Sequence, residues 1–134
     1  MNDLKVVRRG DVKKKPLPGR MIQLVVGKDD ASSPSEALTM GFARYSAESG
    51  KMKPHRHAEE VVLVLSAKKG WTRYGGFGDK PDEMCNPLPL EEGMILHVPE
   101  SEWHVFGYNE GGYVEIAFFY GQADIYSKQR KLSK

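Results

Sequence analysis

The sequence predicts an all-β protein, a sandwich or barrel built from a single domain of 134 residues. The 14 Gly and 8 Pro are too many for a helical bundle and are typical of a turn-rich chain. The apolar segments are short, rich in β-branched and aromatic residues, and separated by clusters of Gly, Pro, Asp, Asn and Ser. A series of brief strands with regular turns indicates a sandwich or barrel.

Each apolar segment between turn clusters is taken as one strand. We expect the core of the domain over about residues 38–120, edge or dimer strands over residues 4–26, and a tail over residues 121–134. The tail contains the only helical-looking stretch, and it is short. The expected strands are Lys5–Val7, Met21–Val26, Leu38–Ser46, Val61–Ser66, Trp71–Tyr74, Met94–Val98, His104–Tyr108 and Tyr113–Tyr120.

Two of these segments are apolar without clean alternation, namely VVLVL at 61–65 and EIAFFY at 115–120. Strands with both faces buried show this pattern, either inside a double layer or against a second subunit. The charges are also unevenly placed. Residues 1–20 carry seven basic and two acidic groups and residues 128–134 carry four basic and no acidic groups, whereas residues 21–127 carry nine basic and sixteen acidic groups. Basic ends on an acidic body and two-faced strands favour a homodimer.

The composition also excludes several classes of protein. One cysteine, Cys85, forms neither an intramolecular disulfide nor a CxxC zinc site. No signal-like or membrane-length apolar run is present, so a soluble cytoplasmic protein without a membrane partner is expected. The basic ends lack the motifs that accompany nucleic-acid binding, so no nucleic-acid partner is expected.

The segment from Gly70 to Leu90 is the longest without regular patterning. It contains Trp71 and Tyr74 among several glycines, followed by a Pro-rich stretch. A loop of this length is often functional, for example as a lid over a pocket. A surface excursion with its aromatic residues packed on the barrel is the alternative.

The first chemically informative stretch contains His55 and His57, followed by Glu59 and Glu60. Residues two apart on a strand project from the same face, so the histidines can offer two imidazoles to one ion. A nearby carboxylate completes a typical set of ligands for a divalent transition metal. By strand parity Glu59 is in phase with the histidines, whereas Glu60 needs a bulge or turn after His57.

The second stretch runs from Gly93 through Pro99 to His104, which opens the next strand after a Pro turn. Together the two stretches resemble the two metal-site motifs of the cupin superfamily. The first motif is matched by Gly50, His55, His57 and Glu60, with Ala67 where the family has Gly. The second is matched by Gly93, Pro99 and His104, with Ser101 in place of Gly and Asn109 one position late.

The resemblance implies a jelly-roll β-barrel with a metal site in its mouth. The implied ligands are His55, His57, Glu60 and His104, with Glu60 preferred to Glu59 because the following strand then aligns with the family's. Four ligands leave two positions of an octahedral ion open for water or substrate. Cupins with this ligand set hold Fe, Mn, Ni, Zn, Co or Cu, so the motif does not name the metal.

Other polar and aromatic residues are weaker candidates for the pocket. His97 and Glu115 lie inside apolar strands and are candidates for catalysis, although a structural role, such as an ion pair between Glu115 and Arg44, fits as well. Candidate pocket walls are Tyr45, Trp71, Tyr74 and Phe106.

The function that these observations favour is a small-metabolite enzyme whose metal acts as a Lewis acid, of the isomerase or epimerase, lyase or decarboxylase, or dioxygenase type. The alternative is a non-catalytic module that binds or senses a small ligand. The pattern favours the enzyme because all four implied ligands are present.

Overall fold

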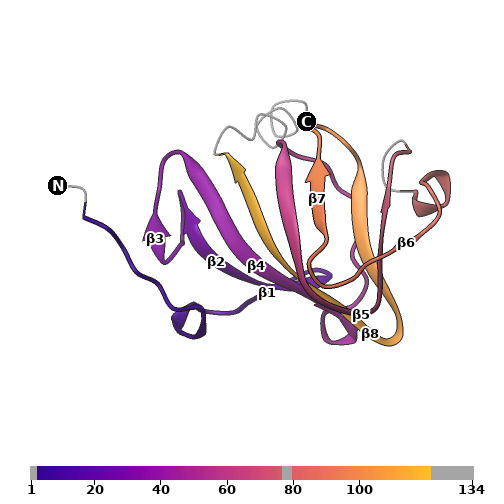
Figure 1. Ribbon diagram of the computed structural model, residues 1–134, viewed down its shortest axis with the longest axis horizontal. Coiled ribbons are helices and arrows are strands. Elements are labelled where there is room, and N and C mark those ends of the chain that lie inside the picture. Colours follow the sequence, from indigo (N-terminus) through magenta and orange to yellow (C-terminus); the bar gives the residue numbers. More distant parts are fainter. Residues whose placement is uncertain (1–2, 77–79, 122–134) are drawn as a thin grey trace.

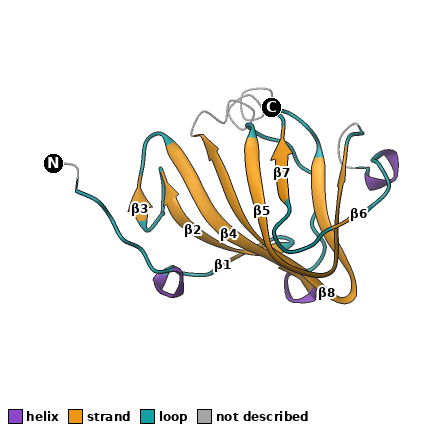
Figure 2. Cartoon of the chain, in the orientation of Figure 1, coloured by secondary structure: helices purple, strands orange, loops and turns teal. Residues whose placement is uncertain are grey.

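The computed structural model describes residues 3–76 and 80–121, and it confirms the all-β class (Figures 1 and 2). Its strands are β1 (Lys15–Leu17), β2 (Arg20–Gly27), β3 (Ser33–Pro34), β4 (Leu38–Ser46), β5 (Glu60–Tyr74), β6 (Leu88–Pro89), β7 (Ile95–Val98) and β8 (His104–Gly121). Short 3₁₀ turns lie at η1 (Arg9–Asp11), η2 (Ala47–Ser49) and η3 (Pro81–Glu83).

The strands form one sheet that curls into an open barrel, in the order β1-β2-β4-β8-β5-β6 (Figure 1). β7 pairs with β5, and the two-residue β3 is the parallel neighbour of β2. Every other pairing in the described part of the chain is antiparallel. The sheet therefore needs no crossover helix, as the turn-rich composition predicts.

The two long strands β5 and β8 pair with each other along both of their halves and bend together (Figure 1). The register shifts between Lys68 and Gly70, where residues 109–112 of β8 bulge out of the ladder. A Cβ on Gly70 would lie 2.4 Å from a methyl carbon of Val114, so the bend requires glycine there. The separate strands predicted over 61–66 and 71–74, and over 104–108 and 113–120, are thus the halves of two bent strands.

The predicted strand Lys5–Val7 is wrong, because these residues form no ladder in the structure. Leu4 and Val6 are largely exposed, at 85% and 77%. The segment that follows instead contacts the outer face of β2 through Gln23. The side-chain amide of Gln23 donates hydrogen bonds to the backbone carbonyls of Arg9 and Val12. Side-chain hydrogen bonds here replace a backbone ladder, and the first strand begins only at Lys15.

The core lies between the two layers of the barrel and is built from alternate residues of β4, β5 and β8. Val62, Val64, Val114 and Ile116 are its fully buried members. Ala43, Tyr45, Leu90, Phe106 and Phe118 complete the cluster. Inward-facing side chains at every second position give a continuous apolar interior.

The unpatterned segment from Gly70 to Leu90 is partly strand. Residues 71–74 belong to β5, and β6 pairs back onto Trp71 and Thr72. Residues 77–79 lie outside the described residues, as does the predicted tail beyond residue 121. Within the described part of the chain, no helix has the length and apolar character to span a membrane.

Candidate metal centre

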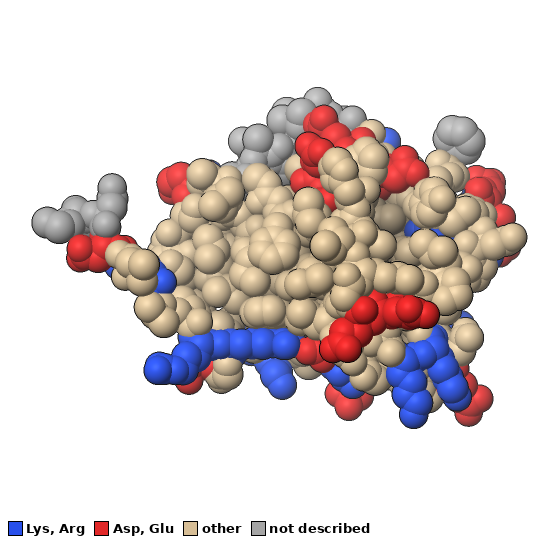
Figure 3. Space-filling view, viewed as in Figure 1, with Lys and Arg blue, Asp and Glu red and all other residues tan. Residues whose placement is uncertain are grey.

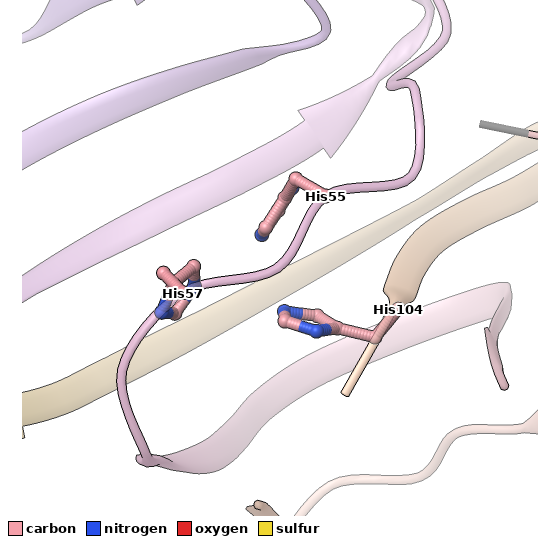
Figure 4. Close-up of side chains that lie close together, drawn as sticks. All are labelled: His55, His57 and His104. Atoms are coloured by element: carbon pink, nitrogen blue, oxygen red, sulfur yellow. The ribbon is translucent and has the colours of Figure 1, made fainter. Parts of the chain in front are cut away.

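The three histidines of the two motifs lie together at one end of the barrel (Figure 4). His55 and His57 come from the loop that precedes β5, and His104 opens β8. One ring nitrogen from each lies within 4.8 Å of the others. The ring centroids are 4.4 Å apart for His55 and His104 and 5.3 Å apart for His57 and His104.

Backbone hydrogen bonds rather than strand alternation bring the histidines together. His55 and His104 exchange two backbone hydrogen bonds of 3.0 Å, which join the loop before β5 to the start of β8. His55 and His57 do offer their rings to one cluster, as expected, but from a loop and not from a strand, because β5 begins only at Glu60. Ser101 stands where the cupin motif has Gly, and it helps to form the turn before His104 at φ 67°, a left-handed conformation that glycine adopts without strain.

Two of the imidazoles are oriented by carbonyl groups. Nδ1 of His104 lies 2.9 Å from the carbonyl of Glu102, and Nδ1 of His57 lies 3.1 Å from that of Ala58. A carbonyl only accepts hydrogen bonds, so each Nδ1 is the donor, and each Nε2 is the nitrogen left to face the cluster. A histidine binds metal through either ring nitrogen, and with Nδ1 engaged by a carbonyl the ligand atom of these two residues is Nε2.

The Nε2 atom of His104 shows that the cluster suits a metal ion. It is buried and has no hydrogen-bond partner among the described residues. A buried acceptor without a partner costs stability unless a ligand satisfies it. The residues present therefore fit a bound transition metal, with imidazole nitrogens as the main ligands.

The structure also brings Glu60 to the histidines. Its side chain is 7% exposed, and its Oε1 lies 3.5 Å from Nε2 of His57 and 3.6 Å from Nε2 of His104. Glu59 instead lies on the outside of the barrel, 2.6 Å from the exposed ring of His97. Strand alternation favoured Glu59 as the carboxylate that faces the histidines. The loop before Glu60 is not extended, so strand alternation does not apply across this loop.

The cluster opens into a cavity of about 500 Å³. Of the predicted pocket walls, Tyr45 and Phe106 line this cavity. Further lining residues that the sequence analysis did not single out include Arg20, Met52, Phe118 and Tyr120. For Arg20, Phe118 and Tyr120 the signal was the inward phase of β2 and β8, which is readable only once the inner face of the strands is known, and Met52 lies in a loop without such a signal.

The remaining candidates do not reach the cavity. Trp71 packs over Gly107 and donates from its indole N–H to Asn109. Tyr74 is 50% exposed and lines a separate groove beside His97. His97 is an exposed residue that lines the same groove as His104, and it is not among the residues that line the cavity.

Glu115 points away from the cavity, because its neighbours Val114 and Ile116 occupy the inner face of β8. It binds Arg44 at 2.8 Å, the structural pairing considered from the sequence, and also Arg9 at 2.6 Å. Burial on its own would raise the pKa of Glu115, but hydrogen bonds from both arginines outweigh it and hold the pKa below its ordinary value.

Tyr45 lines the cavity with a perturbed phenol. Its side chain is buried, with 4% exposure, and burial raises its pKa well above the ordinary value. Arg20 opposes that shift and Glu60 adds to it, so both charges lie near the phenol. Tyr45 therefore keeps its proton at any physiological pH and is a hydrogen-bond donor.

No protein-family model matches the sequence, and no curated protein matches it either. Solved structures do share the fold. A polyketide cyclase from Streptomyces resistomycificus superposes with a TM-score of 0.67 at 19% identity, over 96% of this chain and 94% of that one. An RmlC-like cupin from Shewanella frigidimarina gives 0.56 at 13% identity, over 90% and 93%.

A hydroxypropylphosphonic acid epoxidase from S. wedmorenis gives a TM-score of 0.59 at 14% identity, over 87% of this chain and 58% of that longer one. At such identities the likeness shows the fold and not the activity. The sequence motifs, the antiparallel barrel and these superpositions agree, and the protein has the cupin fold.

Proposed function

We propose that this protein is a metal-dependent enzyme acting on a small molecule, of the isomerase or epimerase, lyase or decarboxylase, or dioxygenase type. The observation that carries the proposal is the buried Nε2 of His104, which makes no hydrogen bond to the described residues and faces two further imidazoles beside a cavity. His55, His57, Glu60 and His104 would hold the ion. A divalent transition metal there supplies Lewis acidity toward an oxygen of the substrate.

The chain's own residues supply the rest of the site. Tyr45 holds its proton on the phenol oxygen and can donate a hydrogen bond to a substrate oxygen. Phe106 and Phe118 form an apolar floor that limits the water around the reacting group. Because His97 and Glu115 stand elsewhere, the cavity draws on Tyr45 and Glu60 for proton positioning.

Metal content tests the first half of the proposal. Elemental analysis of the purified protein should find close to one equivalent of a transition metal, and a His57→Ala/His104→Ala variant should lose it. His97→Ala is the matched control, because His97 is exposed and lies outside the cluster. Failure to bind Fe, Mn, Ni, Zn, Co or Cu when each is supplied would refute the metal site.

Turnover tests the second half. The metal-loaded protein and the double variant should be screened against hydroxy acids, keto acids and sugars for isomerisation and lyase activity, and for oxygen consumption. Turnover by the wild type alone supports an enzyme. Metal-dependent binding of a ligand that is never converted would favour the non-catalytic binding module instead.

A further inference from the structure

The cavity beside the histidines is lined by more positive than negative side chains. The basic lining residues are Arg20, Lys51, Lys53 and Arg56, and Glu60 is the acidic one. The whole chain carries a formal charge of only +2, so this local excess is not a consequence of composition. A concave site with one sign of charge concentrates ligands of the opposite sign.

Arg20 is held at the cavity wall by a tight turn between β1 and β2. Its Nη1 donates to the carbonyl of Pro18 at 3.0 Å. Gly19, at φ 83°, packs so closely that a Cβ there would lie 2.6 Å from Cα of Met52, which also lines the cavity. The position of the guanidinium is thus set by the backbone around it.

The charge of Arg20 is not paired with a carboxylate among the residues that the structure describes. No Asp or Glu of the described residues forms an ion pair with it, whereas Arg9 and Arg44 on the outer face share Glu115. The strand register also places Arg20 beside Tyr45, because the next residues, Met21 and Arg44, are partners. A guanidinium fork next to a protonated phenol matches the two oxygens of a carboxylate.

An apolar wall of the cavity extends from Arg20 and Tyr45 to the histidines. The Phe106 ring lies 5.0 Å from the ring of Tyr45 and 6.3 Å from that of His104. Ile116 and Phe118 extend the same surface. A ligand with an apolar body can therefore lie on Phe106 with its charged end at Arg20.

We propose that the cavity binds a small organic carboxylate with an apolar body, and that Arg20 is the residue that anchors its negative charge. This rests on the proposed function in so far as the bound carboxylate is taken to be the substrate. A volume of about 500 Å³ suits a ligand of that size. Lys51 and Lys53 are exposed at the rim and attract the anion at longer range.

The test is a calorimetric titration of the metal-loaded protein with benzoate and, separately, with benzamide, which is neutral and of similar size. Benzoate should bind more tightly than benzamide. Arg20→Gln should weaken benzoate binding about 10- to 100-fold, as expected for the loss of a charge-assisted hydrogen-bond pair, and leave benzamide unchanged. Arg8→Gln is the matched control, because Arg8 is exposed and does not line the cavity.

Lys53→Gln is a second variant at an exposed position, which guards against a folding defect in Arg20→Gln. It should weaken benzoate binding roughly 2- to 5-fold at low salt, and less at high salt because a rim charge is screened. Equal affinity for benzoate and benzamide, no binding of benzoate at its highest soluble concentration, or an equal loss of both ligands in Arg20→Gln would overturn the inference.

The titration is repeated on metal-free protein to separate this inference from the proposed function. Arg20-dependent benzoate binding in a protein that takes up no metal would refute the proposed function and support the anion site. A protein that retains its metal but binds benzoate independently of Arg20 would refute the anion site and support the proposed function.

Discussion

Gly107 is expected to be intolerant of any side chain because of a single contact with Trp71. The two residues are direct partners on β8 and β5. A Cβ on Gly107 would lie 2.2 Å from Cζ2 and 2.3 Å from Cη2 of the indole. Gly107 is not among the glycines with positive φ, so the cost of Gly107→Ala is steric and not conformational.

The magnitude follows from overpacking. Forcing a methyl group into a filled site costs about 1–3 kcal/mol in the free energy of unfolding. At roughly 4 °C per kcal/mol for a domain of this size, the melting temperature should fall by about 4–12 °C. Urea unfolding followed by far-UV circular dichroism measures the free energy, and a thermal scan checks the shift.

A double-mutant cycle with Trp71→Ala isolates the contact. Without the indole, Gly107→Ala should change stability by less than about 0.5 kcal/mol, so the coupling energy should be about 1–3 kcal/mol. Gly121→Ala is the control on the same strand, since the nearest atom to its Cβ lies 3.9 Å away. Additive effects of the two substitutions would refute the assignment of Trp71 to packing over Gly107.

Three further expectations follow from the structure. The pKa of Glu115 is depressed, so its ion pairs stabilise the folded state above the unfolded pKa near 4.5, and this stabilisation is lost as the pH falls through the lower folded pKa. Glu115→Gln should therefore lower the free energy of unfolding by up to about 1 kcal/mol at pH 7, and by less at pH 3, in urea titrations. Ser101→Gly should stabilise the protein by about 0.5 kcal/mol, because removing the side chain relieves the strain of the left-handed backbone conformation and this gain exceeds the entropic cost of a glycine. A loss of stability in the same urea titration would contradict this expectation. Val61, Ile95 and Phe119 are exposed at 41%, 69% and 39% on the outer side of adjacent strands. Figure 3 shows a broad face of the molecule with few charges across its middle. We therefore expect light scattering to find a homodimer that Ile95→Lys/Phe119→Lys converts to monomers, and a monomeric wild type at micromolar concentration would exclude the dimer.

Local pattern was sufficient wherever a strand alternates cleanly. The predicted strand Leu38–Ser46 has the bounds of β4, because its buried residues fall at every second position. The bends of β5 and β8 were not predictable in the same way. The bend at Gly70 depends on Val114, a residue 44 positions later in the sequence that has no local signal at the bend.

The two-faced strands explain why side-chain direction was the weakest part of the prediction. Strand alternation predicts that the side chain of Glu115 projects from the other face of the strand than those of Val114 and Ile116. Because both faces carry apolar residues, the sequence does not show which face is inside. Trp71 and Tyr74 likewise looked suitable for a pocket wall, and only their partners across the sheet place them elsewhere.

The sequence by itself determined the class of the fold, the spacing of the histidine motifs and the family that they resemble, because strand periodicity, turn residues and motif spacing are local properties of the chain. Only the tertiary structure decided that His104 meets His55 and His57, that Glu60 and not Glu59 turns inward, and that Arg20 lines the same cavity. Arg20 lines this cavity together with Tyr120, which lies 100 positions later in the sequence, and such residues meet only when backbone pairing between distant strands closes the barrel.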